Sequence, residues 1–317
     1  MNDETNQYLP RFLREQGDAD APTSQSWSQE DYADLIHPDD ASALQKLNAV
    51  PGLKSSFEKF ASATVEPMYR GEALGNNIKL DFDQIGEYYN LLPPICEKFG
   101  IASIPDLFLE MSPIPNAYTF GASRPFIVIS SGLLEYMTVD EVQLVLAHEC
   151  GHILCHHPLY NMMIAAYDSG FAKFLPMLPR IDRPLLYAWK RASEFSADRA
   201  MLAFAGNPEK AMRVIIRLSA GGHRFTNDIN IDVYKKQIEE YYALSQTLSL
   251  QSMMQKFLKI FSFRPFASIR SHEFTKWSKT PKFSLLSRKI GTYDPRCPKC
   301  GAAMQRNTNI CVNGHFS

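Results

Sequence analysis

The chain has 317 residues, of which 45% are hydrophobic and 21% charged, and its formal net charge is −1. These values are typical of a globular protein with one large domain plus attachments, or with two domains. The near-neutral charge excludes a molecule whose whole surface is a polyelectrolyte binder. Charge is nevertheless uneven: residues 1–40 carry ten acidic and two basic side chains, and residues 251–317 carry twelve basic and two acidic ones. Such segments either bind partners of opposite charge or are simply solvated surfaces.

The N-terminus, Met1-Asn2-Asp3-Glu4, has neither the basic region nor the apolar region of a secretory signal. The most apolar stretch, residues 159–189, is interrupted by charged residues and prolines. No uninterrupted apolar run therefore reaches the roughly 18 residues that a transmembrane helix needs. We expect a cytoplasmic protein without a transmembrane span, and contact with a membrane surface stays open.

In chain order, residues 1–40 are polar and acidic without apolar periodicity, which predicts a disordered N-terminal segment. Residues 41–290 are expected to form the main domain. Apolar residues with helical spacing predict helices between about residues 41 and 100. Three short apolar runs between residues 106 and 130 then predict a small sheet. The expected fold class is mainly α, of the α+β type.

Two longer helices are predicted after the sheet. Thr138 and Glu141 form a capping-box pattern, so a helix should begin there and end near His157, because a proline follows. A second helix should run from about Pro184 to Ala205, before a glycine at the C-cap. Residues 208–260 have helical patterns again.

The first of these helices carries the sequence His148-Glu149-Cys150-Gly151-His152. Histidines four residues apart lie on one helical face, so both imidazoles can reach one zinc ion. A glutamate beside them can accept a proton from a water molecule without acting as a ligand. An accidental match, with histidines bonded to backbone carbonyls, would occur in about one chain in a hundred. The position within a predicted helix favours the metal site.

A catalytic zinc needs a third protein ligand and an open position. A histidine six residues after the motif is excluded, because Pro158 stands there and Cys155 replaces the glycine that accompanies such a histidine. Glu194, on the second predicted helix, is the expected third ligand, the alternative being an ordinary surface glutamate. Asp198 lies one turn further along the same face. Its carboxylate is expected to accept the free N–H of a ligand histidine and so fix its tautomer.

With these residues the chain resembles the HtpX and CAAX-prenyl-endopeptidase family of zinc metalloproteases, a gluzincin group. The resemblance covers roughly residues 60–275. It rests on Asn116-Ala117, on Ser131-Gly-Leu-Leu134 with Leu146-Ala-His-Glu-Cys-Gly-His152, on His156, and on Glu194-Phe-Ser-Ala-Asp198.

The resemblance implies a helical catalytic domain with a small sheet. It also implies that residues 116–121 form an edge strand in which Asn116, Ala117 and Tyr118 pair with an extended substrate. An unpaired strand edge can bind the backbone of such a peptide. The alternative for Asn116 is a turn.

The chain departs from the family pattern at several places. Many members have transmembrane helices, whereas this chain has no apolar stretch long enough for one. This difference argues against prenyl-protein processing in a membrane. The later His-Pro…Arg motif reads Arg264-Pro265…Arg270. Arg270 is a candidate for stabilising the oxyanion, and a structural ion pair is the alternative. His156 returns to the metal-binding face, where it would either contact a ligand or line the cleft.

Residues 291–317 contain Cys297, Cys300, Cys311 and His315 in the pattern C-x2-C…C-x3-H. Three thiolates and an imidazole make a closed tetrahedral site, which predicts a zinc ribbon with a structural metal ion. The alternative is a tail with unconnected cysteines. Ribbons this small usually dock onto a protein partner. The basic surroundings leave nucleic acid open, although it is the less expected partner.

Together these patterns predict a zinc-dependent metalloendopeptidase that acts on polypeptides, with one catalytic and one structural zinc ion. The alternative is a non-proteolytic adaptor, or a module that binds protein or nucleic acid through its basic C-terminal part. The intact Glu149 argues against the adaptor, because a merely structural metal site does not need it.

Overall fold

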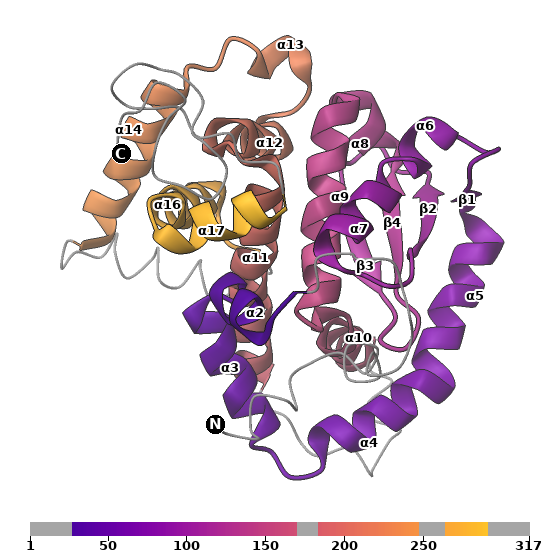
Figure 1. The fold of residues 1–317 in the computed structure, drawn as a ribbon. Coiled ribbons are helices and arrows are strands. Elements are labelled where there is room, and N and C mark those ends of the chain that lie inside the picture. Colours follow the sequence, from indigo (N-terminus) through magenta and orange to yellow (C-terminus); the bar gives the residue numbers. More distant parts are fainter. Residues whose placement is uncertain (1–26, 170–182, 247–263, 291–317) are drawn as a thin grey trace.

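The computed structural model describes residues 27–169, 183–246 and 264–290. A small sheet, helix α9 and helix α5 form one side of the molecule, and α11, α12, α14 and α16 form the other (Figure 1). The helices up to the main strands are α2 (Gln29–Leu35), α3 (Pro38–Asn48), α4 (Leu53–Phe60), the π-helical segment η2 (Ala61–Val65), α5 (Glu66–Asn76), α6 (Gly86–Tyr89) and α7 (Leu92–Phe99). The later helices are α8 (Ser131–Tyr136), α9 (Val139–Leu154), α10 (His157–Asp168), α11 (Arg183–Ala205), α12 (Pro208–Ala220), α13 (His223–Thr226), α14 (Ile231–Gln246), α16 (Ala267–Ser278) and α17 (Pro281–Lys289).

The sheet has four strands in the order β1-β2-β4-β3. They are β1 (Ile78–Leu80), β2 (Asp106–Glu110), β3 (Ala117–Phe120) and β4 (Phe126–Ser130). Strands β2 and β4 are parallel, and the two outer pairs are antiparallel. All of β4 is buried, because both faces of the sheet are covered. Ile127 and Ile129 join the main core with α9, whereas Phe126 and Val128 pack toward Ala73 of α5.

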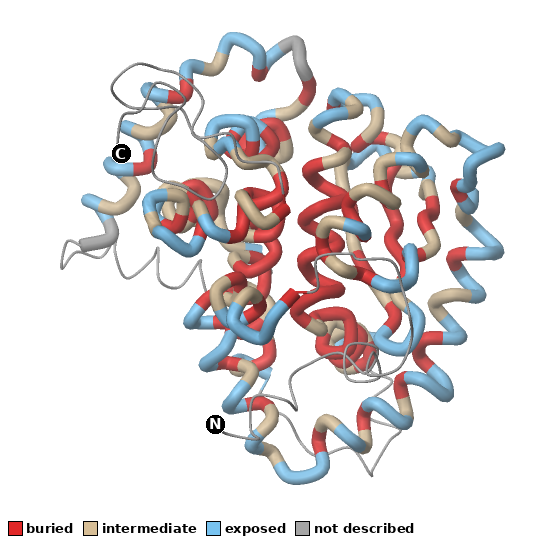
Figure 2. Tube along the Cα trace, in the orientation of Figure 1, coloured by how far each residue is buried: buried red, intermediate tan, exposed pale blue. Residues whose placement is uncertain are grey.

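Helices α9 and α11 pack closely at the centre of the molecule, where the buried residues concentrate (Figure 2). The predicted capping box at the start of α9 is confirmed: Thr138 accepts from the backbone of Glu141, and the Glu141 carboxylate accepts from the backbone of Thr138. Gly206, with φ of 62°, directly follows α11 in the left-handed region. Sequence signals thus mark where α9 begins and where α11 ends.

Gly151 allows these two helices to approach each other. A Cβ atom on Gly151 would lie 2.6 Å from the Cβ of Ala200 and 3.1 Å from the Cα of Ala197. We expect Gly151→Ala to lower the free energy of unfolding by about 1–3 kcal/mol, because the helices would have to separate. Chemical denaturation would measure this. Gly71→Ala is the control: a Cβ there meets nothing within 4 Å, so higher helix propensity should leave stability unchanged or slightly greater. Equal effects at both sites would contradict the packing argument.

The mainly α, α+β fold is confirmed. The structure differs from the sequence prediction near the N-terminus, where α2 is helical, begins with a capping box at Ser28, and buries Tyr32 and Leu35. The predicted disordered segment therefore cannot extend to residue 40. Residues 1–26 and the predicted ribbon, 291–317, lie outside the described residues. Within the described part, no helix is both long and apolar enough to cross a membrane.

Candidate metal centre

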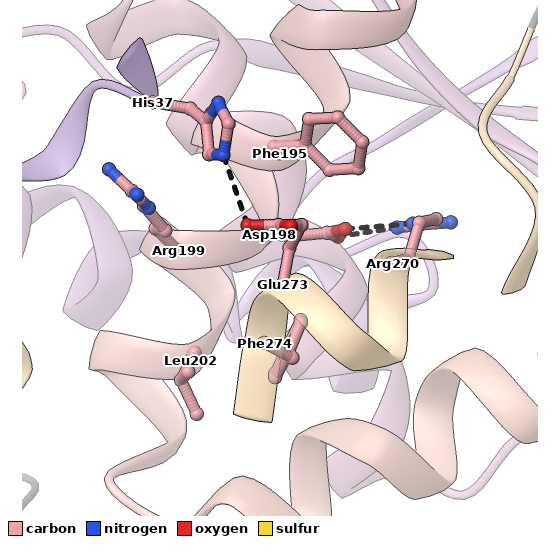
Figure 3. Close-up of a pocket in the computed structure, with 8 residues that line it drawn as sticks. All are labelled: His37, Phe195, Asp198, Arg199, Leu202, Arg270, Glu273 and Phe274. Atoms are coloured by element: carbon pink, nitrogen blue, oxygen red, sulfur yellow. Dashed lines mark hydrogen bonds and ion pairs between the residues drawn. The ribbon is translucent and has the colours of Figure 1, made fainter. Parts of the chain in front are cut away.

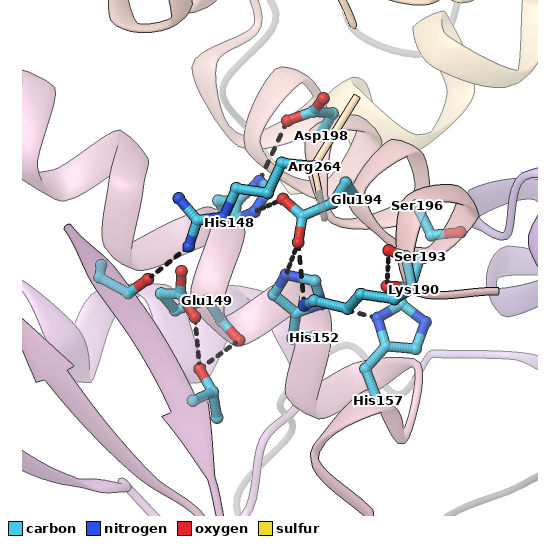
Figure 4. A network of polar contacts seen from close by, with 12 residues as sticks. His148, Glu149, His152, His157, Lys190, Ser193, Glu194, Ser196, Asp198 and Arg264 are labelled. Atoms are coloured by element: carbon cyan, nitrogen blue, oxygen red, sulfur yellow. Dashed lines mark hydrogen bonds and ion pairs between the residues drawn. The ribbon is translucent and has the colours of Figure 1, made fainter. Parts of the chain in front are cut away.

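Helices α9 and α11 bring together three side chains whose donor atoms can surround one metal ion. His148 and His152 come from α9, and Glu194 comes from α11 (Figure 4). One ligand atom from each lies within 4.8 Å of the other two, and all three residues are buried. The Nε2 atoms of His148 and His152 lie 3.5 and 3.7 Å from the Glu194 carboxylate oxygens. Two imidazoles and one carboxylate match the donor set of a catalytic zinc site.

The charges around this centre suit a cation. Burial alone would raise the pKa of Glu194, but the charge of Lys190 and the hydrogen bond with His148 hold it well below its usual range. Burial alone would lower the pKa of His148, but the carboxylates of Asp198 and Glu194 raise it to about 9. His152 has a lowered pKa because it is buried. An ionised, buried carboxylate between two imidazoles fits a divalent metal ion.

Each ligand histidine has a partner on its other ring nitrogen. The Nδ1 of His148 lies 3.1 Å from the carboxylate of Asp198. Asp198 in turn accepts two hydrogen bonds from Arg270 of α16, at 2.8 and 2.5 Å (Figure 3). Such a carboxylate orients the imidazole and leaves Nε2 for the metal. Arg270 is buried in this ion pair, which agrees with the structural alternative for this residue.

The corresponding partner of His152 is His157, which the sequence reasoning missed. Their Nδ1 atoms lie 2.7 Å apart, and His157 Nε2 lies 2.9 Å from the carboxylate of Asp40. Where the Asp40 carboxylate accepts the N–H of His157 Nε2, the other ring nitrogen, His157 Nδ1, accepts the N–H of His152. The Nε2 of His152 then carries a lone pair toward the metal. His156, the predicted neighbour, has a left-handed backbone at the turn before α10, and its role stays a prediction.

The relay of contacts from Asp40 through His157 to His152 can be tested by measuring zinc affinity. We expect Asp40→Asn to weaken zinc binding about 10- to 100-fold, because His157 is no longer fixed as an acceptor. Competition with a chromogenic chelator would measure the affinity. Asp39→Asn is the matched control, since the side chain of Asp39 is 77% exposed. Equal affinities in the wild type and Asp40→Asn would show that the relay does not orient His152.

Glu149 and β3 face each other beside the centre. The hydroxyl of Thr119, in β3, donates to the Glu149 carboxylate oxygen Oε2 at 2.6 Å. The Ser130 N–H donates to the Asn116 carbonyl, so Asn116 faces β4 and the backbone groups of Ala117 and Thr119 face outward. Among the described residues, no strand pairs with this outer edge of β3. Sequence reasoning missed Thr119.

The other predicted substrate-binding residues lie near this edge. Arg264 donates to the side-chain oxygen of Asn116 at 3.0 Å and to the Ala117 carbonyl at 3.3 Å. Arg264 thus lies at the start of the open edge, in the position where the sequence departs from the family's histidine. The hydroxyl of Tyr118 donates to Glu110 instead, and its backbone faces β4 by strand alternation.

A His-Glu-x-x-His helix with a glutamate from a second helix defines the gluzincin class of metalloproteases. Residues 103–273, more than half of the chain, match Peptidase family M48. The chain therefore belongs to this family and is a zinc metalloprotease.

Relatives with assigned names agree with this family. The chain is similar to the plastoglobule-localized metallopeptidase 48 of Arabidopsis thaliana chloroplasts, with 30% identity over 264 residues that cover 81% of this chain and 76% of the relative. It is also similar to protease HtpX of Legionella pneumophila strain Corby, with 26% identity over 194 residues, or 52% of this chain and 66% of the relative. No solved structure gives a significant match.

Proposed function

We propose that this chain hydrolyses peptide bonds within polypeptides, with one zinc ion held by His148, His152 and Glu194. The observation that carries the proposal is the placement of three buried ligand atoms within 4.8 Å of one another, with Glu149 next to His148 on the same helix. When bound, zinc supplies a Lewis acid that lowers the pKa of water and polarises a carbonyl group.

The residues of the chain would move and hold the proton as follows. Thr119 binds Oε2 of Glu149, so the other carboxylate oxygen can take a proton from the attacking water and deliver it to the leaving amine. The outward backbone groups of Ala117 and Thr119 hold an extended substrate by strand pairing. Asn116 supports the start of β3, the strand that would pair with the substrate. Tyr118 packs its ring on the face of the sheet that carries Phe126 and Val128, so its predicted contact with the substrate stays a prediction.

Positive charge beside the reacting carbonyl would come from Arg264, which already donates at the open edge of β3. Arg270 acts instead as a positioning residue, because both of its hydrogen bonds hold Asp198. Asp198 and His157 keep the ligand histidines in the tautomer that binds metal. The structural zinc at Cys297, Cys300, Cys311 and His315, and a protein partner at that ribbon, stay predictions.

Metal removal tests this function. We expect the purified chain to cleave casein, and we expect 1,10-phenanthroline to reduce cleavage by at least about 100-fold, because the remaining groups alone do not activate water at neutral pH. Adding back one equivalent of zinc to the dialysed protein should restore it. Gel electrophoresis and mass spectrometry would follow the fragments. Cleavage that persists after chelation, with zinc absent by elemental analysis, would contradict the proposal.

A further inference from the structure

An open cleft of about 440 Å³ is lined in part by Arg191 and Phe195, which flank the ligand Glu194 in the sequence of α11. It is bounded by α3, by the first half of α11, and by residues 264–269. Its walls are largely apolar and include Ala43, Leu185, Phe195, Phe266 and Ile269. The cleft is large enough for one or two amino-acid side chains, and its apolar walls would cover their aliphatic parts.

Among the described residues that line this cleft, three are cations and one is a carboxylate. Lys46 comes from α3, Arg191 from α11, and Arg264 from the segment before α16, while Asp39 is the acidic residue. Asp39 points largely into solvent, with 77% of its side chain exposed. Arg191 is half-buried, and this burial lowers the pKa of its guanidinium. Partial removal of a cation from water makes a nearby anion more favourable than it would be at a fully exposed site.

The cleft connects to the open edge of β3 through Arg264. This arginine lines the cleft and also contacts Asn116 and Ala117, at the N-terminal end of β3. Arg191 lies three residues before the ligand Glu194 on α11. β3 runs from Ala117 to Phe120. A substrate strand that pairs antiparallel with it would therefore have its C-terminal part near Asn116. Residues that follow the scissile bond would thus approach the cleft.

We propose that this cleft is a subsite for a carboxylate of the substrate, on the C-terminal side of the cleaved bond. The proposal rests on the peptidase function and adds a substrate class to it. The guanidinium group of Arg191 binds the carboxylate in a charge-assisted way, and Lys46 adds positive charge at the rim. Arg264 stays at the β3 edge, between the cleft and the reacting carbonyl. The carboxylate belongs either to an aspartate or glutamate side chain or to the end of a peptide chain.

Matched peptides would test the subsite. Cleavage sites in casein are first mapped with the wild type, and one site is copied into fluorogenic peptides. These peptides carry Glu, Gln or Lys at each of the three positions after the cleaved bond, with either a free or an amidated C-terminus. We expect kcat/KM at one position to be about 10-fold higher for Glu than for Gln, and lower still for Lys. If the preference instead follows the free terminus, the occupant is a chain end.

Charge reversal assigns the preference to this cleft. For Arg191→Glu combined with Lys46→Glu, the order of rates should invert, so that the Lys peptide exceeds the Glu peptide. Lys210→Glu is the matched control, because Lys210 is exposed in the first turn of α12, where an added acidic residue is tolerated. It should keep the wild-type order. Zinc content and thermal unfolding of each variant establish that the metal site and the fold are intact.

The outcomes separate the two proposals. A wild type that cleaves Glu, Gln and Lys peptides equally, at either type of C-terminus, overturns the subsite and leaves the peptidase function standing. A preference for carboxylates that survives the double reversal likewise overturns it, because the carboxylate then binds elsewhere. A wild type that cleaves neither casein nor any peptide overturns the peptidase function itself.

Discussion

Glu149→Gln should reduce peptide hydrolysis by about 10²- to 10⁴-fold while the protein keeps its zinc. Glutamine has the same shape as glutamate, and its side-chain oxygen can still accept the hydrogen bond that Thr119 donates to Oε2. What is lost is the ability to take a proton from water. His148, His152 and Glu194 are unchanged, so the metal ligands stay in place.

The measurement is kcat/KM for a cleaved peptide together with zinc per chain and the melting temperature. Glu135→Gln provides the matched control, because Glu135 is exposed on α8 and the same charge is removed. Activity should drop in the first variant only. A Glu149→Gln protein with full activity would show that another group takes the proton. A protein without zinc would show that Glu149 contributes to metal binding.

The parts of the fold that the sequence predicts well depend on local signals. The start of α9 follows from the capping box of Thr138 and Glu141, whose hydrogen bonds join residues three apart. The end of α11 follows from Gly206. The three strands between residues 106 and 130 are short apolar runs with clear breaks. In contrast, β1 has only three residues, two of them exposed, so it has no apolar period to detect.

Helix α2 shows why the N-terminal prediction extended too far. Its acidic residues gave the whole segment a polar composition. However, Tyr32 and Leu35 lie on one face and are buried against the main core. Two apolar anchors with helical spacing are enough for a short helix when a tertiary surface is available, and that surface is visible only in the folded structure.

The metal centre was predictable where spacing along one helix decides the geometry. His148 and His152 are four residues apart, and Glu194 and Asp198 repeat this spacing on α11. Groups that reach the site from distant parts of the chain were not predictable. Asp40 lies 117 residues from His157, and Arg264 lies 148 residues from Asn116. No local pattern records such pairs. His157 was passed over for the same reason, because its importance lies in its contact with Asp40.

Glu194→Ala should remove the catalytic zinc while leaving the chain folded. A catalytic site with two histidines and no carboxylate has lost one of its three protein ligands. The loss of the negative charge also leaves the side chain of Lys190, which lies 3.0 Å from Glu194 Oε1, as an uncompensated cation beside the metal position. Both effects weaken zinc binding. Asp198 and Arg270 remain paired one turn further along α11, so the packing of α16 should persist.

Elemental analysis of zinc per chain gives the result directly, with thermal unfolding as the test of folding. If the predicted ribbon also binds metal, the wild type should contain two zinc ions and Glu194→Ala one. Glu239→Ala, which changes an exposed glutamate of α14, should match the wild type.

Equal zinc in the wild type and Glu194→Ala would remove Glu194 from the ligand set. If that shared value were one ion, the metal would belong to the cysteines of residues 297–311, and the adaptor would become the better account of this chain. A loss of one ion together with loss of casein cleavage would instead place both metal and activity between α9 and α11.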